Sequence, residues 1–210
     1  MISLLGITVF AYLLGSIPSG LIAGKLRGID IRTQGSGSTG STNALRLLGP
    51  RIASIVLAAD VLKGALPVLI VANETIPISS NTLGAQYPAM AATSGLAAIA
   101  GHNWPIFAKF RGGRGVAPAL GAALVMTPLG ALAGLALWGV FVGIWRYVSL
   151  ASLTAVMFTG GLMVINFSRN TVLWPYAVFG GVTILVVLYQ HKENIKRLIQ
   201  KKEPRLGENR

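Results

Sequence analysis

The stretch of sequence that decides the fold is residues 115–144, GVAPALGAALVMTPLGALAGLALWGVFVGI, which contains no charged residue. As one helix it would be about 45 Å long, whereas the hydrocarbon core of a bilayer is about 30 Å thick. Thr127 and Pro128 stand near its middle, and proline is tolerated at the start of a helix but not in its interior. The sequence therefore predicts two short helices that meet at Thr127-Pro128.

The distribution of basic residues favours the same arrangement. With two helices in this stretch, every Lys and Arg except Lys63 and Arg169 lies on one side of the membrane. With one helix, Arg146 and the basic tail after residue 190 would move to the opposite side. Because cytoplasmic loops carry the excess of Lys and Arg, we predict seven transmembrane helices with the N-terminus outside and the C-terminus in the cytoplasm. The expected spans are residues 2–24, 52–71, 82–100, the two helices of 115–144, 150–167 and 171–189, with an outer loop at 73–81, a turn at 168–170 and a basic helical tail from residue 190.

Composition agrees with an all-α membrane protein. The chain has 210 residues, of which 53% are hydrophobic and 11% charged, whereas a soluble domain carries about 25% charged residues. The first apolar segment has no basic residue before it, so we expect it to be a span rather than a cleaved signal peptide. We predict a single polytopic domain over residues 1–210.

Net charge and cysteine content exclude other classes. The net charge of +12 would suggest nucleic-acid binding in a soluble protein. Here the positive-inside rule, anionic lipid and a phosphorylated substrate account for it, and we expect no nucleic-acid partner. The chain has no cysteine, which excludes disulfides and thiolate catalysis.

Two glycine-rich basic segments fall in the predicted cytoplasmic loops: residues 35–46, GSGSTGSTNALR, and residues 110–115, FRGGRG. Glycine exposes backbone N–H groups, hydroxyls add donors and arginine adds fixed charge, which together suit phosphate binding. The first segment lacks the Walker A pattern. A flexible linker and a basic surface turn are the simpler alternatives.

Further polar residues stand in the tail and inside the spans. His191, Asn194 and Arg197 are spaced to share one helix face, although the tail could equally be an amphipathic helix that lies on anionic lipid. Asp60 and Lys63 are expected to form an ion pair that faces the bundle, with a direct role at the site as the alternative. His102 is equally compatible with a structural and a functional role.

The chain also lacks patterns that other chemistries need. Neither histidine is followed five residues later by an aspartate, which is the pattern of acyl-CoA-dependent glycerolipid acyltransferases. Paired aspartates are absent among only 6 acidic residues, so a magnesium-templated reaction is hard to build. We therefore expect no metal and no cofactor.

Four blocks of sequence, in order, resemble the bacterial membrane acyl-phosphate:glycerol-3-phosphate acyltransferases, the PlsY family. They are GSGSTGSTNALRLLG at residues 35–49, GHNWPIFAKFRGGRGVA at 101–117, YVSLAS at 147–152 and HKENIKRL at 191–198. The resemblance covers nearly the whole chain. It departs from the family pattern at Arg114, where lysine is usual, and at Ser38, Ser41, Pro118 and Lys201.

The resemblance implies acyl transfer from acyl phosphate to the 1-hydroxyl of glycerol 3-phosphate, which gives lysophosphatidic acid and inorganic phosphate as the first step of phospholipid biosynthesis. Acyl phosphate has a good leaving group, so no covalent enzyme nucleophile is needed, and the substrate's own phosphate is the base proposed for the family. The implied catalytic residues are Ser36, Arg46, Arg114, His191 and Asn194, and the implied substrate-binding residues are Gly37, Gly40, Thr42, Asn43, Gly112, Gly113, Gly115, Ser149 and Arg197. The acyl chain is expected to leave laterally through a groove between helices.

The same resemblance implies a multi-pass protein of the bacterial inner membrane with its active site on the cytoplasmic face. Its expected partners are the two substrates and membrane lipids; we expect a monomer, with the acyl-phosphate-forming enzyme as a candidate partner. The main alternative is a transporter or flippase for an organic phosphate or lipid, which should carry polar residues on several spans and show repeat symmetry. Only Asp60 and Lys63 fit that expectation. A pure membrane scaffold would not need two phosphate-type loops.

Overall fold

The computed structural model describes residues 3–72, 83–169 and 173–208, and within these residues the chain forms helices and turns but no strand. The all-α prediction is therefore confirmed. The helices are α1 (Leu4–Gly15), α2 (Ser19–Lys25), α3 (Ser41–Leu48), α4 (Pro50–Ala72), α5 (Leu83–Asn103), the short 3₁₀ helix η1 (Ile106–Ala108), α6 (Val116–Met126), α7 (Pro128–Trp145), α8 (Val148–Ser168), α9 (Trp174–Gln190) and α10 (Lys192–Ile199).

The uncharged stretch divides as the sequence predicts. Helix α6 ends at Met126 and α7 begins at Pro128, so that Thr127 alone separates them. Proline occupies the first turn of α7, where the missing N–H would have no intrahelical partner in any case. The backbone N–H of Thr127 donates to the carbonyl of Ala123 at 2.8 Å and closes α6.

The first predicted span is interrupted rather than continuous. Helices α1 and α2 are separated at residues 16–18, where Pro18 has no N–H to donate and the helical hydrogen bonding fails. The side chain of Lys63 donates to the freed carbonyl of Ile17 at 3.1 Å, and Ser19 donates to the carboxylate of Asp60. The predicted ion pair is confirmed, with Lys63 Nζ 2.8 Å from Asp60 Oδ1 and both side chains buried. Through Lys63, this ion pair therefore also supplies a hydrogen bond to a backbone carbonyl at the interruption, because polar backbone groups inside a membrane need partners within the protein.

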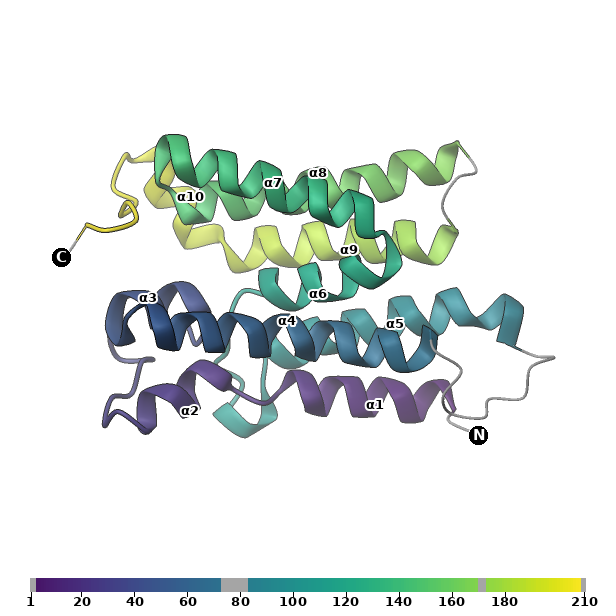
Figure 1. Ribbon diagram of the computed structural model, residues 1–210, viewed down its shortest axis with the longest axis horizontal. Coiled ribbons are helices and arrows are strands. Elements are labelled where there is room, and N and C mark those ends of the chain that lie inside the picture. The colour runs from purple at the N-terminus through teal and green to yellow at the C-terminus, as the bar shows by residue number, and fades with distance from the viewer. Residues whose placement is uncertain (1–2, 73–82, 170–172, 209–210) are drawn as a thin grey trace.

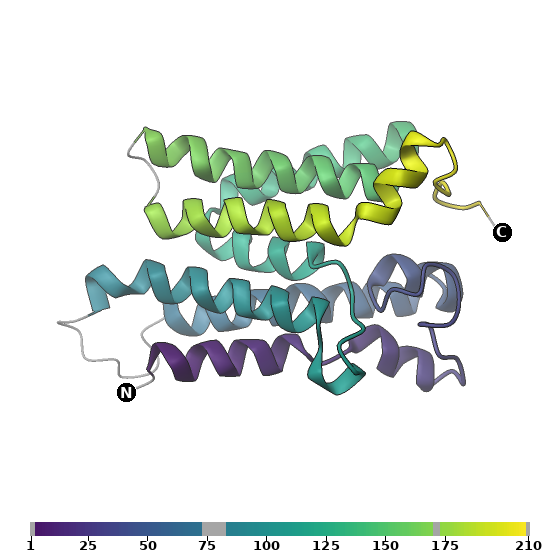
Figure 2. The same cartoon turned by 180° about the vertical axis from the view of Figure 1, so that it is seen from behind.

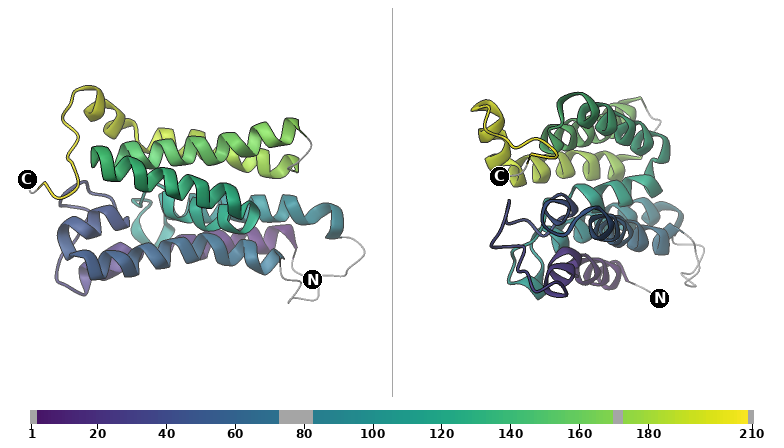
Figure 3. Two further views of the ribbon diagram at one scale, coloured as in Figure 1. Left: turned by 45° about the horizontal axis from the view of Figure 1, so that its top comes forward. Right: turned by 60° about the vertical axis from the view of Figure 1, so that its left-hand side comes forward.

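The helices form two layers with α6 between them (Figure 1). Helices α1, α4 and α5 make one layer and α7, α8 and α9 the other; α6 packs against α4 and α7, and α5 packs against α9, as the reverse view in Figure 2 also shows. Many buried positions are alanine, such as Ala91, Ala98 and Ala122, which lets neighbouring helices approach closely. Helices α2, α3 and α10 all lie at the same end of the molecule (Figure 3).

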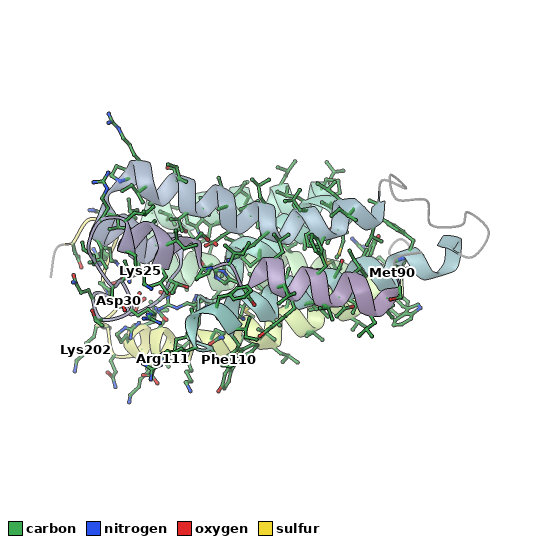
Figure 4. All side chains as sticks on the ribbon, turned by 90° about the horizontal axis from the view of Figure 1, so that it is seen from below. Lys25, Asp30, Met90, Phe110, Arg111 and Lys202 are labelled. Atoms are coloured by element: carbon green, nitrogen blue, oxygen red, sulfur yellow. The ribbon has the colours of Figure 1, made fainter. Side chains whose placement is uncertain are left out.

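Four segments of the described chain are long and apolar enough to cross a bilayer: Leu4–Lys25, Pro50–Ala72, Pro128–Trp145 and Val148–Ser168. Helices α6 and α9 are shorter and also apolar. Large apolar side chains such as Leu5, Leu129 and Leu185 lie on the outer surface, as lipid-facing residues do. The charged residues Lys25, Asp30 and Lys202 gather at one end, whereas Met90 lies toward the other (Figure 4). The predicted outer loop at 73–81 and residues 170 and 171 fall outside the described residues.

Candidate active site

A cavity of about 190 Å³ opens at the end of the molecule where the polar segments meet. Four segments that are distant in the sequence contribute to its polar part. Of the residues singled out from the sequence, those that line it are Ser36, Gly40, Thr42, Asn43, Arg46, Arg114, Gly115, Ser149 and His191; those that do not are Gly37, Gly112, Gly113, Asn194 and Arg197. Asp60 and His102 also line the cavity, so one member of the buried ion pair of α4 reaches the site.

Asn43 holds the first glycine loop in shape. Its Oδ1 accepts a hydrogen bond from the backbone N–H of Ser36 at 3.0 Å, and its Nδ2 donates to three loop carbonyls, those of Ile31, Gln34 and Ser38. Gly35 adopts a positive φ of 59°, and a Cβ there would overlap the Asn43 amide. Asn43 therefore acts on the loop backbone, which in turn directs its N–H groups.

The second glycine loop is fitted against His102 and the first loop. The N–H of Gly113 donates to the carbonyl of His102 at 3.0 Å, and a side chain at Gly113 would overlap the imidazole ring. The N–H of Thr39 donates to the carbonyl of Gly112 at 3.4 Å, which joins the two loops directly. His102 therefore has a structural role here whatever else it does.

Two helices start at the cavity. Helix α3 follows Gly40, and α6 follows Gly115; the first residues of both helices line the cavity. N–H groups in the first turn of a helix have no intrahelical acceptor and carry partial positive charge, so they favour anions. With Arg46 and Arg114 beside them, these helix starts form a site suited to phosphate.

The imidazole of His191 is buried and neutral. Its Nδ1 lies 2.9 Å from the carbonyl of Val187, and because a carbonyl only accepts, Nδ1 carries the proton and Nε2 is the free acceptor. Burial, followed by the charge of Arg114, lowers the pKa of His191 to about 4. His191 therefore presents a neutral hydrogen-bond acceptor to the cavity at pH 7.

Glu203 is a cavity-lining residue that the sequence did not reveal. It lies in the tail after α10, is 6% exposed, and lines the cavity. Its carboxylate accepts hydrogen bonds from Ser149 at 2.7 Å, Asn194 at 2.6 Å and Arg197 at 2.7 Å. Burial alone would raise the pKa of Glu203, but these hydrogen bonds outweigh it and hold the pKa below its usual value. In the sequence Glu203 is one of three acids in a basic tail, a pattern that resembles exposed surface charges.

Glu203 binds Asn194 and Arg197, the two predicted tail residues that do not line the cavity, and it also binds Ser149, which does. It joins Ser149 of α8 to Asn194 and Arg197 of α10 and so fixes the tail helix against the bundle. His191, which precedes α10, and Asn194 within it are buried, whereas Lys192 and Lys196 are exposed. The Oδ1 of Asn194 is buried and has no hydrogen-bond partner within the described ranges.

The cationic groups keep an excess of positive charge at the site. Burial lowers the pKa of Arg114 to about 10, with Glu203 acting in the opposite direction, so this arginine remains charged at neutral pH. Arg46 and Arg197 lie close enough to influence it, and Glu203 is the carboxylate that opposes them. One buried carboxylate does not neutralise three guanidinium groups, so the site keeps a net positive charge that favours a phosphate.

The same cavity continues away from the charges as an apolar groove. Its walls are residues of α6, α7, α8 and α9, among them Leu120, Leu135, Val156, Met163 and Phe179. Leu57 of α4 and Leu135 of α7 line it and are exposed on the outer surface. One continuous space therefore joins an anion site to an apolar channel.

Comparisons with known proteins identify the family. The family model for glycerol-3-phosphate acyltransferase matches residues 5–201. A glycerol-3-phosphate acyltransferase of Prochlorococcus marinus is 39% identical over 203 residues, which covers 96% of this chain and 98% of the relative. One of Bacillus velezensis is 42% identical over 201 residues, with 94% and 95% covered. The chain belongs to the glycerol-3-phosphate acyltransferase family.

Solved structures of this acyltransferase family share the fold. The crystal structure of PlsY, an integral membrane glycerol 3-phosphate acyltransferase, in its glycerol 3-phosphate form matches with a TM-score of 0.83 and 38% identity and covers 97% of this chain and 96% of the crystallised chain. The lysophosphatidic acid form matches with a TM-score of 0.81 at the same identity, with 97% and 95% covered. The resemblance predicted from the motifs is confirmed: this is a multi-pass membrane acyltransferase of lipid biosynthesis.

Replacing Glu203 by glutamine should destabilise this acyltransferase. The variant leaves Arg197 without its carboxylate and places an amide donor against a donor, which should cost about 1–3 kcal/mol. We expect a lower unfolding midpoint in detergent at pH 7. Because the pKa of Glu203 is lowered in the fold, its stabilising effect is fully present above the ordinary glutamate pKa of about 4.3 and is lost as the pH falls from there through the lowered value, so the difference in midpoint should narrow over that range.

The matched control is Glu193→Gln, which removes an exposed acid from the same helix region and should leave the midpoint unchanged. Equal midpoints for Glu203→Gln and the wild type would show that Glu203 does not hold α10 in place.

Proposed function

We propose that the protein transfers a fatty acyl group from acyl phosphate to the 1-hydroxyl of glycerol 3-phosphate. The observation that carries this proposal is the single cavity that joins a cationic site, built from two helix starts with Arg46 and Arg114, to an apolar groove. Both proposed substrates carry a phosphate, and one also carries an acyl chain. The related PlsY structures in glycerol 3-phosphate and lysophosphatidic acid forms support the acceptor and the product.

The reaction needs position and charge more than a dedicated nucleophile. The 1-hydroxyl oxygen attacks the acyl carbonyl carbon, the bond from that carbon to the phosphate oxygen breaks, and the electron pair leaves with inorganic phosphate. The hydroxyl proton ends on a phosphate oxygen, so atoms and charges balance without a cofactor. Holding two phosphates side by side against their repulsion is the task for which Arg46 and Arg114 are suited.

We assign the roles by position in the cavity. Ser36 and Thr42 would contact phosphate or the developing oxyanion. The N–H groups of Gly37 and Gly40 donate to Gln34 and Ser38, so these glycines, like Asn43, would contribute by holding that loop. The loop of Gly112, Gly113 and Gly115 would bring the start of α6 to the substrate. The Ser149 hydroxyl donates to Glu203. Ser149 would contact substrate only after its side chain rotates about the Cα–Cβ bond and breaks this hydrogen bond.

His191 and Asn194 would position glycerol 3-phosphate. The free Nε2 of neutral His191 can accept a hydrogen bond from a glycerol hydroxyl, as can the unpaired Oδ1 of Asn194. Arg197 is held by Glu203 and would act by adding positive charge to the site. We also propose that the protein acts as a monomer.

We also propose seven spans, with the site on the cytoplasmic face of a bacterial plasma membrane. The chain contains no cysteine, so single cysteines can be introduced without background. Arg27→Cys and Arg169→Cys, at exposed positions, should react with a membrane-impermeant maleimide from opposite sides of the membrane. Reaction of both from the same side of sealed vesicles would contradict this topology.

The donor is tested with purified protein and glycerol 3-phosphate. Acyl phosphate should support lysophosphatidic acid formation with release of inorganic phosphate, whereas acyl-CoA at the same concentration should not. Turnover with acyl-CoA and none with acyl phosphate would overturn the donor assignment while leaving the family membership intact.

A further inference from the structure

The far end of the apolar groove is closed. Met163 of α8 and Phe179 of α9 line the cavity, and each is 2% exposed. Both belong to a buried cluster that also contains Met126, Tyr176 and Met90, and the ring of Phe179 lies against Gly95 of α5. The groove therefore ends on packed core rather than on lipid.

Two helices give the same depth for this groove. Along α8, Ser149 at the polar end and Met163 at the closed end are separated by about 21 Å, at 1.5 Å per residue. Along α9, His191 and Phe179 are separated by about 18 Å. An extended hydrocarbon chain advances about 1.25 Å per carbon, from bonds of about 1.5 Å at nearly tetrahedral angles, so this depth accepts about fourteen to seventeen carbons.

We infer that Met163 and Phe179 form the end wall that sets the acyl-chain length this enzyme accepts. The inference rests on the proposed function, because it takes the acyl phosphate as the occupant of the cavity. Continuity supports that occupant: the groove starts among the phosphate-site residues and has no charged residue along its distal walls. A chain that fills the groove to Met163 gains burial for every methylene, whereas a longer chain meets packed core.

Thr183 lies part of the way along the groove. It is 4% exposed, lines the cavity about 12 Å from His191 along α9, and its hydroxyl has no hydrogen-bond partner in the part of the chain that the structure describes. A larger apolar side chain at this position would block the groove at about two-thirds of its depth along α9. Substitutions at Thr183 and Met163 should therefore move the length limit in opposite directions.

The competing path is a lateral one. Leu57 and Leu135 line the cavity and are also exposed on the outer surface, so a chain could leave between α4 and α7 before it reaches Thr183. In that case the enzyme would not measure length at Met163. Substitutions at Met163 and Thr183 should change the accepted acyl-chain length if the chain follows the groove to its closed end, and should leave it unchanged if the chain leaves laterally.

The experiment measures kcat/KM for acyl phosphates of eight to twenty carbons with the purified enzyme. Met163→Ala should raise the ratio of rates for the eighteen- and fourteen-carbon donors by about tenfold, and Thr183→Leu should lower the rate for the sixteen-carbon donor by at least about tenfold relative to the ten-carbon donor. Met90→Ala is the matched control, because Met90 is buried in the same cluster and lies outside the lining of the cavity among the described residues. It should keep the wild-type length profile.

Unchanged profiles in both Met163→Ala and Thr183→Leu, with normal total turnover, would overturn the end wall and favour the lateral path. If Thr183→Leu does not fold, Met163→Ala alone decides, since it removes atoms rather than adding them. A shift in Met90→Ala equal to that in Met163→Ala would also overturn the inference. Absence of turnover with every acyl phosphate in the wild type would instead contradict the proposed function.

Discussion

Arg114→Ala should lower kcat/KM for glycerol 3-phosphate by about 10²–10³, the effect of removing one preorganised donor from a charged transition state. Arg114 lines the cavity beside the start of α6 and remains charged at neutral pH, although burial lowers its pKa to about 10. Without it, two phosphates would have to approach with one guanidinium fewer to offset their repulsion. Steady-state kinetics at fixed ionic strength measures the loss.

The same loop supplies the control for this prediction. Arg111 is exposed and lies outside the cavity lining, so Arg111→Ala should stay within about twofold of the wild type. Arg114→Lys keeps the charge but loses the planar fork, and we expect it to recover most of the activity lost in Arg114→Ala. Equal losses for Arg111→Ala and Arg114→Ala would mean that general surface charge, rather than a placed guanidinium, matters.

His191→Ala should cost about 10²–10³ in kcat/KM, because it removes the buried acceptor that faces the substrate. The pKa of His191 is lowered to about 4, so its charge does not change between pH 5 and pH 8. Any acid limb in that range should therefore follow the phosphate of glycerol 3-phosphate, whose second ionisation lies near pH 6. The measurement is the pH dependence of kcat/KM in the wild type and in His191→Gln.

Both proteins should show the acid limb at the same pH, with His191→Gln lower throughout. Lys192→Ala, at the exposed neighbouring position, should behave as the wild type. An acid limb present in the wild type and lost in His191→Gln would show that this histidine titrates during turnover and would remove it from the neutral role.

The helical framework could be predicted because its signals are local. An uncharged run too long for one span, with proline in its middle, fixes the break between α6 and α7. The distribution of basic residues predicted that the polar segments lie on the same side of the membrane. In the structure, these segments line one cavity. The interruption at Pro18 was missed because hydropathy does not register a lost hydrogen bond, and its compensation by Lys63 comes from another helix.

The site was predicted in composition but not in its internal bonding. A side chain such as Asn43 offers the same donors to a ligand as to its own loop, and only the fold shows that its amide is engaged with the backbone of residues 31–38. Glu203 was missed because its distant partner Ser149 comes from α8, and because the turn after α10 that brings it back to Asn194 and Arg197 follows no helical spacing. Contacts of this kind leave no periodic signal in the sequence.

The central claim is that one cavity holds both phosphates while the acyl group passes directly between them, and initial-rate kinetics with phosphate release tests it most directly. With acyl phosphate and glycerol 3-phosphate both varied, we predict intersecting double-reciprocal lines, one phosphate released for each lysophosphatidic acid formed, and no burst of phosphate when the acceptor is omitted. Parallel lines, together with a phosphate burst and an acylated enzyme detected by intact-protein mass spectrometry, would contradict direct transfer.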